Sequence, residues 1–178
     1  MIVVAIIGVM TILGIPSYRA WVQNTQIYNA AESAMNGLQK AKAEAVKQNT
    51  NISFTLLGVG PAWTPSWQIS VVNPAAIIES STGREGSKNV TSRGWTVDTV
   101  TGLATNTQAT TVTFNNLGGV VASAASLGQI DFASATLASA RNLRVTIGIK
   151  GVGSNIRVCD PDPELVDPSL TKRDPRAC

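Results

Sequence analysis

The stretch MIVVAIIGVMTILGIPSY, residues 1–18, decides the fold that the rest of the chain can adopt. Residues 1–15 carry no charge and a single hydroxyl, at Thr11. A helix that is apolar on all sides lies either deep in a protein core or in lipid. The run is short for a bilayer span of about 20 residues. A membrane helix is still favoured over a cleaved signal peptide, because no basic segment precedes the run and no small-residue cleavage site follows it.

The residues after Pro16 continue the helix with two distinct faces. Apolar or small residues recur at steps of three, four and seven, which is the spacing of one helical face. They are Ile27, Ala31, Ala34, Met35, Leu38, Ala41, Ala45 and Val46. We expect Pro16 to kink the helix without ending it, and residues 49–51 to end it. A helix over residues 1–48 is about 70 Å long, so its first part must protrude from a domain of this size.

From residue 51 onward the sequence predicts strands. Short alternating or β-branched runs cover residues 51–57, 67–72, 110–115, 129–132, 142–149 and 155–159, with 93–97 as a further candidate. Residues 80–93 are polar, carry mixed charge and are predicted to form a surface loop. The predicted fold class is α+β, a long protruding N-terminal helix packed on a C-terminal antiparallel β-sheet or sandwich head. Its parts are a transmembrane or filament-core segment (1–20), an amphipathic segment of the same helix (21–49) and a β-rich periplasmic or extracellular head (50–178).

Composition excludes several classes of function. The chain has 178 residues, of which 44% are hydrophobic and 14% charged, and a net charge of +3. It contains no histidine, which removes histidine-dependent nucleophile systems and every histidine metal site. No residue constellation points to catalysis. We therefore expect a protein that is not an enzyme and has no cofactor or metal.

Two cysteines, Cys159 and Cys178, lie near the C-terminal end. Two thiols alone cannot complete a four-ligand zinc site. A disulfide is favoured over two reduced thiols because the segment between them is rich in proline and aspartate and would otherwise be poorly ordered. In the chain-entropy model, a disulfide that closes such a loop stabilises the folded chain by about 3 kcal/mol. The bridge would also indicate an oxidising compartment.

Basic residues near the C-terminus are candidates for contact with phosphate. They are Lys150, Arg157, Lys172, Arg173 and Arg176. The same segment holds an equal number of acidic residues, so its net charge is zero. The sequence leaves open whether the folded chain separates the two signs.

Residues 1–18 resemble the N-terminal helix of type IV pilins and type II secretion pseudopilins, and Pro16 falls on the helix-kinking proline of that family. Residues 31–54 and the two ends of the tail, 155–161 and 174–178, are similar to the GspH/FimT branch. The resemblance implies that this sequence begins six residues into the mature helix. It also implies helix packing in the membrane and then in a filament core. The apolar residues of that packing are Ile2, Val3, Val4, Ile6, Ile7, Val9, Ile12, Leu13 and Ile15.

The resemblance implies a minor pilin that enters the inner membrane as a single-pass protein and is incorporated into a type IV pilus on the cell surface. Its partners would be other pilins, bound through the N-terminal helix. Two alternatives stay open, a pseudopilin H of a type II secretion system and a minor pilin that binds DNA during natural transformation. FimT-type members use a Gly-Arg-x-Arg motif for DNA, and here the equivalent segment reads Ser154-Asn155-Ile156-Arg157, which keeps only the second arginine.

Overall fold

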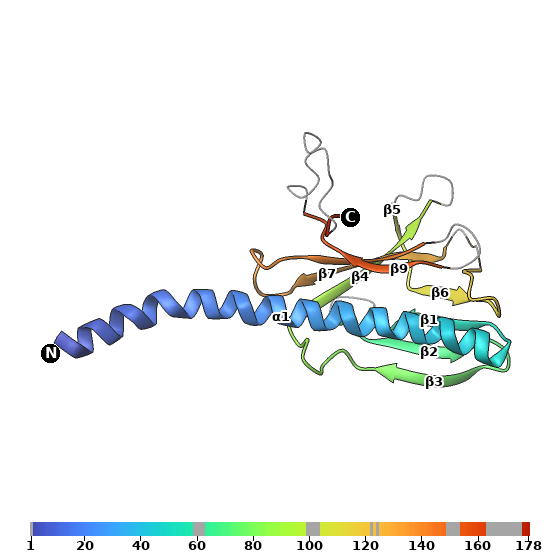
Figure 1. Cartoon of the computed structure of the whole chain (residues 1–178), viewed down its shortest axis with the longest axis horizontal. Coiled ribbons are helices and arrows are strands. Elements are labelled where there is room, and N and C mark those ends of the chain that lie inside the picture. Colours follow the sequence, from blue (N-terminus) through green and yellow to red (C-terminus); the bar gives the residue numbers. More distant parts are fainter. Residues whose placement is uncertain are drawn as a thin grey trace.

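The computed structural model describes residues 2–58, 63–98, 104–121, 123, 125–148, 154–162 and 176–178, with side chains from Ser17 onward. One helix, α1 (Ile2–Gln48), precedes all the strands. It continues through Pro16 without interruption, as predicted. At 47 residues it is about 70 Å long, and its first part extends well beyond the head (Figure 1).

The helix ends where the sequence predicts, and the reason is local. Asn49 adopts a left-handed conformation with a φ of 49°. The Asn49 amide donates to the carbonyl of Val46, and the Thr50 amide donates to the carbonyl of Ala45. This pair of bonds is the Schellman motif, in which a residue of positive φ satisfies the last carbonyls of a helix.

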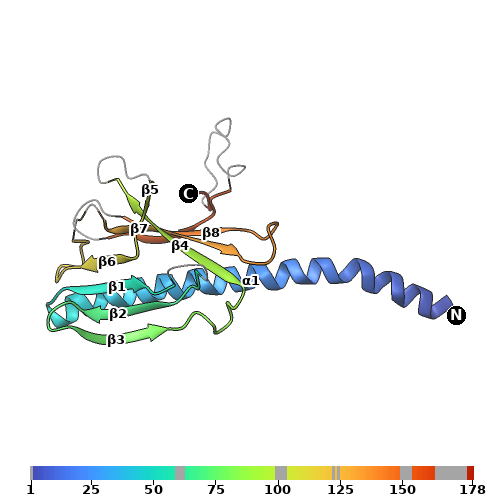
Figure 2. The ribbon, with the colours of Figure 1, turned by 180° about the vertical axis from the view of Figure 1, so that it is seen from behind.

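Nine described strands form two antiparallel sheets. The four-stranded sheet has the order β3-β2-β1-β6, from β1 (Ile52–Leu56), β2 (Trp67–Val71), β3 (Ala76–Ser81) and β6 (Thr111–Phe114). The five-stranded sheet has the order β5-β4-β7-β8-β9, from β4 (Val90–Val97), β5 (Ala104–Gln108), β7 (Leu127–Ser134), β8 (Leu143–Ile147) and β9 (Ile156–Cys159). Both sheets lie against the second half of α1 (Figures 1 and 2). The predicted α+β class is therefore confirmed.

The core lies between the helix and the inner faces of the two sheets. Strand β1 alternates buried and half-buried residues, as a strand with one covered face does. Small side chains on the helix, mainly alanines, let both sheets approach it closely. The helical members of the core are Ile27, Ala30, Ala31, Ala34, Leu38, Ala41 and Ala45, which is the face that the periodicity predicts, except that Val46 is exposed and Met35 only half-buried.

Two strands were not expected from the sequence. Strand β3 overlaps the start of the predicted loop at 80–93, and strand β4 occupies its last part, so that prediction was too long at both ends. Strand β5 was not predicted at all. Both β3 and β5 are edge strands, and neither shows regular burial. Apart from Ile78 of β3, which packs against the core, hydrogen bonding to a neighbouring strand holds these edges in place.

Candidate functional site

The segment of α1 just before the head presents exposed aromatic side chains. Tyr18, Trp21 and Tyr28 are each more than half exposed, and the ring centroids of Tyr18 and Trp21 lie 6.1 Å apart. Arg19 is exposed beside them. Tyrosine, tryptophan and arginine are the residues that anchor helices at a membrane–water interface. Within the described part of the chain, no helix combines the length and apolar character that a membrane span requires.

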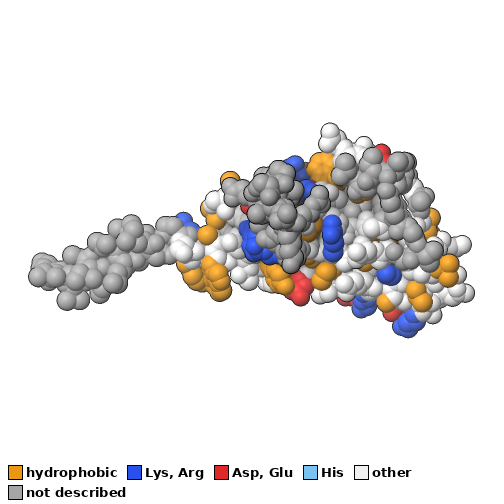
Figure 3. All heavy atoms as spheres, turned by 45° about the horizontal axis from the view of Figure 1, so that its top comes forward, with side chains coloured by type: hydrophobic (Ala, Val, Ile, Leu, Met, Phe, Trp, Pro, Cys, Tyr) orange, Lys and Arg blue, Asp and Glu red, His pale blue; other side chains and the backbone are white. Residues whose placement is uncertain are grey.

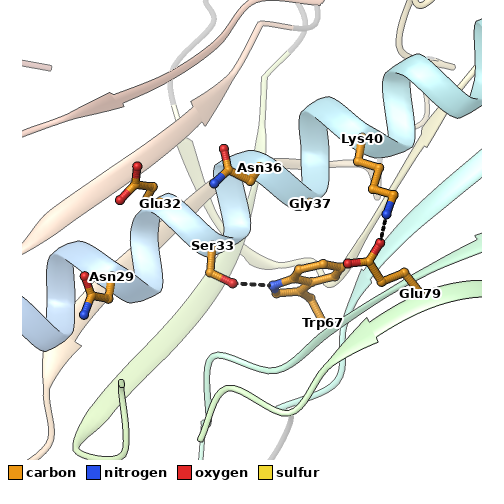
Figure 4. Close-up of a pocket in the computed structure, with 8 residues that line it drawn as sticks. All are labelled: Asn29, Glu32, Ser33, Asn36, Gly37, Lys40, Trp67 and Glu79. Atoms are coloured by element: carbon orange, nitrogen blue, oxygen red, sulfur yellow. Dashed lines mark hydrogen bonds and ion pairs between the residues drawn. The ribbon is translucent and has the colours of Figure 1, made fainter. Parts of the chain in front are cut away.

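A polar groove of about 400 Å³ runs between α1 and strands β2 and β3. Figure 4 shows that the indole of Trp67 points to the helix, where its Nε1 donates to the hydroxyl of Ser33 at 3.1 Å. Further along, Lys40 forms an ion pair with Glu79 of β3. These contacts attach the four-stranded sheet to the helix.

Polar side chains on the other flank of α1 attach the five-stranded sheet. Gln23 accepts from the hydroxyl of Ser134 at 3.0 Å. Asn24 accepts from the amide of Arg141 at 2.9 Å. Each bond joins the helix to a segment more than a hundred residues away, so the helix and head form a single connected unit.

The outer face of the five-stranded sheet carries the charged side chains of the strands around one carboxylate. Asp131 on β7 accepts from the indole of Trp95 at 3.0 Å, from the amide of Gln129 at 3.0 Å and from Arg144 Nε at 2.7 Å. Its neighbour across β4 is Arg93. The carboxylate therefore holds the Arg144 guanidinium and the Trp95 ring in fixed positions.

Arg157, the one predicted basic residue on a described strand, lies on this same face. Its Nε donates to the hydroxyl of Thr146 at 3.3 Å. Together with Arg144 it lines a cleft of about 640 Å³, and no Asp or Glu side chain is among the described residues that line this cleft. Figure 3, which turns this side of the head forward, shows Lys and Arg side chains exposed there.

The remaining predicted basic residues are not gathered at this cleft. Arg176 lines a separate cavity with Tyr28 of the helix and Arg141. Lys150, Lys172 and Arg173 lie outside the described residues, and so do the side chains of the apolar residues at 2–15. The structure therefore places Arg157 and Arg176 in two different environments.

The two cysteines are joined, as the sequence favours. Cys159 at the end of β9 and Cys178 form a disulfide, with their Cα atoms 5.1 Å apart. Next to it, Asp160 is buried and ion-paired with Arg141. The amide of Asp160 donates to the carbonyl of Arg176, and the amide of Cys178 donates to the carbonyl of Asp160. The tail end is thus fastened at Asp160, directly after the edge strand β9.

Sequence reasoning missed Arg93, Trp95, Asp131 and Arg144 as members of one charged cluster. Each occupies an outward position of its strand, and alternation could have shown that. Their proximity depends on the pairing of β4 with β7 and of β7 with β8, which local sequence does not reveal.

Comparisons with known proteins identify a family to which the chain is similar. Residues 30–151 match the family described as type II transport protein GspH. The type IV minor pilin FimU of Pseudomonas aeruginosa (strain PAO1) has a crystal structure that is 18% identical in sequence, with a TM-score of 0.49, covering 81% of this chain and 94% of that one. No curated protein matches the chain. The family match covers more than half of the chain and confirms the GspH/FimT resemblance seen in its residues. The chain therefore belongs to the GspH family of type II transport proteins.

Proposed function

We propose that the chain is a minor pilin that the inner membrane holds by residues 2–15 and that a type IV pilus incorporates through α1. The observation that carries this proposal is the continuity of α1. One uninterrupted helix has its second half packed against the sheets of the head and its first half free of them (Figure 2). The role is that of a scaffold subunit, with no chemistry performed on a substrate.

Assembly moves the apolar segment from lipid into a filament core, which exchanges one apolar surrounding for another. The hydrophobic effect therefore contributes little to that step, and packing between helices must drive it. The head adds lateral contacts. Since side-chain bonds tie both sheets to α1, the head would keep its orientation when the helix packs in the filament.

A single charge in the apolar segment tests this role. An Ile7→Asp substitution puts a carboxylate in the proposed membrane segment, which costs about 2.5–3.5 kcal/mol at a helix centre. We expect the variant to be lost from the membrane fraction and from sheared pili. Gln39→Asp, an equal change of charge at an exposed position of the same helix, is the matched control and should leave both unchanged. Wild-type incorporation of Ile7→Asp would rule out this mode of assembly.

The pseudopilin alternative predicts a different phenotype. A deletion strain of a minor pilin should lose surface pili, whereas a deletion strain of a pseudopilin H should keep its pili and lose protein secretion through the type II system. Neighbouring pilus genes or neighbouring secretion genes would discriminate the two alternatives independently.

The cleft beside Arg157 supports DNA binding as a second candidate function. Arg157 and Arg144, the latter also paired with Asp131, line a cleft without a carboxylate side chain among its described lining residues. Phosphate contacts from basic side chains supply most of a non-specific affinity for DNA. A gel shift of the full chain in detergent should weaken as salt rises. Arg157→Ala should lower the salt slope by about one, whereas Lys47→Ala, at the far end of the helix, should not. The triple change of Arg157, Arg173 and Arg176 to alanine should abolish the shift. No shift at low salt would exclude this function.

A further inference from the structure

The loop between β7 and β8, residues 135–142, is the part of the head nearest to the N-terminal end of α1 (Figures 1 and 2). It lies beside the helix at its exposed aromatic segment. A groove of about 360 Å³ runs between the two, lined by Thr136 and Leu137 of the loop and by Tyr18, Arg19, Val22 and Gln23 of the helix. The loop is therefore level with residues 18–23 of α1.

Hydrogen bonds fix the height of this loop on the helix. The hydroxyl of Ser134, at the start of the loop, donates to Gln23. At the other end, the amide of Arg141 donates to the side chain of Asn24. The guanidinium of Arg141 is ion-paired with Asp160, so this attachment adds no net charge. Because both ends of the loop are tied to α1, the depth of the helix in a membrane also sets the depth of the loop.

The loop carries no charge between these two attachments. Residues 135–140 read ATLASA, and four of the six are exposed. The Ser134 hydroxyl accepts from the amides of Thr136 and Leu137 at 3.2 and 2.9 Å, and the Ala140 amide donates to the carbonyl of Leu137 at 3.1 Å. A polar group that already has a partner loses less when water is removed than one that depends on water. Leaving bulk water therefore costs this loop little in desolvation.

Distances along α1 compare the level of the loop with the thickness of a bilayer surface. A helix rises about 1.5 Å per residue, so Tyr18 and Gln23 lie about 4.5 Å and 12 Å beyond Ile15, the last residue of the apolar segment. The headgroup layer on one side of a bilayer is about 5–8 Å thick. With residues 2–15 in the membrane, the level that the loop occupies begins inside this layer.

Exposed charges on the neighbouring loop of the head are further from the apolar segment. The β3–β4 connection carries two cations and one carboxylate, all exposed, at Arg84, Glu85 and Lys88. The Asn89 amide donates to Gln26, and a Cβ on Gly86 would lie 3.4 Å from the Asn29 side chain. This loop is therefore level with residues 26–29, about 16–21 Å beyond Ile15. The uncharged loop lies within reach of the headgroups, and the charged loop lies outside them.

The helix residues level with the uncharged loop have the chemistry of a membrane interface. Arg19 is the one charged residue of the sequence before Glu32, and it forms no ion pair within the described part of the chain. Long cationic side chains extend to lipid phosphates, and the rings of tyrosine and tryptophan favour the headgroup layer. Tyr18 and Trp21 are 65% and 64% exposed, so both rings are accessible to lipid.

We propose that the β7–β8 loop lies in the phospholipid headgroup layer while residues 2–15 are in the membrane. The head then contacts the bilayer at this loop and at Tyr18, Arg19 and Trp21. This inference rests on the proposed membrane role of residues 2–15 and adds a second point of contact beside the helix. Two contacts restrain the tilt of α1, so the bilayer holds the head in one orientation before assembly.

Quenching of a fluorescent label by nitroxide lipids tests this placement in the purified full chain, reconstituted in phosphatidylcholine vesicles. Both natural cysteines are in a disulfide, so the new thiol of Ala138→Cys, in the exposed part of the loop, takes the label alone. A nitroxide on the lipid headgroup should quench this label several-fold more than a label at Leu117→Cys, the matched control. Leu117 is 71% exposed, and its neighbour Asn116 bonds to Asn49, about 50 Å beyond Ile15.

A second set of variants tests whether the aromatic residues hold the loop at this depth. Tyr18→Ala together with Trp21→Ala should lower the quenching at residue 138 at least about twofold, because interfacial aromatic residues set the depth and tilt of a helix. Tyr28→Ala is the matched control. Tyr28 is also exposed but lies about 20 Å beyond Ile15, so its loss should leave the quenching unchanged.

Equal quenching at residues 138 and 117, or no loss of quenching in the double variant, would overturn the proposal. Resistance of the chain to alkaline extraction from the vesicles reports the insertion of residues 2–15 separately. A chain that is extracted contradicts the proposed membrane role and this placement with it. A chain that stays inserted while its loop is not quenched contradicts this placement alone.

Discussion

Replacing Gly37 by alanine separates the preference of an isolated helix from the demands of packing. Gly37 lies inside α1. Glycine in a helix interior is about 1 kcal/mol less favourable than alanine. If only the helix mattered, Gly37→Ala would stabilise the protein by about that amount.

The contacts of Gly37 predict the opposite sign. A Cβ at this position would lie 3.0 Å from Phe54 Cε2 and 3.1 Å from Trp67 Cε2 and Cζ2. The two rings are stacked, with centroids 5.7 Å apart, and a hydrogen bond to Ser33 holds Trp67 in place. Neither ring can retreat easily. Overpacking of this kind costs about 1–3 kcal/mol, so the net change is a loss of about 1 kcal/mol.

Urea unfolding of the full chain in detergent, followed by far-UV circular dichroism, measures this difference. In a thermal melt of the same samples, a loss of about 1 kcal/mol corresponds to a fall of about 2–4 °C in Tm for a chain of this size. Ala43→Gly, on the exposed side of the same helix, is the control and should cost about 1 kcal/mol through propensity alone. If Gly37→Ala raises the stability by about 1 kcal/mol instead, the rings are not limiting and the reasoning is wrong.

Three further outcomes are expected. Replacing Cys159 and Cys178 by serine should lower the free energy of unfolding by about 3 kcal/mol, measured by urea titration, whereas a loss near zero would mean that the bridge does not constrain the unfolded chain. The hydroxyl of Ser126 is a buried side-chain group without a hydrogen-bond partner among the described residues, so Ser126→Ala should be neutral or stabilising by up to about 1 kcal/mol, and a clear loss in Tm would reveal a missing partner. The hydrogen bond from the Gln48 side chain lowers the pKa of Glu44. The stabilisation from this bond is therefore present above the ordinary pKa of glutamate and is lost as pH falls through the lowered pKa of Glu44. Carboxyl NMR titration should show that Gln48→Ala raises the pKa of Glu44.

Helix α1 and most of the strands were predictable because their sequence signals are local. The spacing of alanines and leucines predicted the buried face of α1, and Asn49 marked its end. Strand β2 was predicted within a residue, since a β-branched run is bounded there by turn residues. Strands β3 and β5 were missed because neither shows a regular alternation of buried and exposed residues. Each is an edge strand that pairs with one neighbouring strand. The polar run that starts at Ser80 was therefore predicted to form a loop.

The candidate surfaces were less predictable. Arg157 could be named from the sequence, but its neighbour Arg144 could not, because their cleft depends on which strands pair. The position of the β7–β8 loop has the same origin, because only the packing of the sheet against α1 brings its uncharged residues level with Tyr18 and Arg19.

By itself, the sequence determined a charge-free leading segment, a helix with one small-residue face, a strand-rich head and a pair of cysteines, because each of these depends on residue type and short-range spacing. Only the tertiary structure decided which strands are neighbours. That choice gathered Trp95, Asp131 and Arg144 on one sheet, and the packing of this sheet on α1 brought the β7–β8 loop beside Tyr18 and Arg19. Long-range strand pairing is set by the packing of the whole core, so no local pattern in the chain records it.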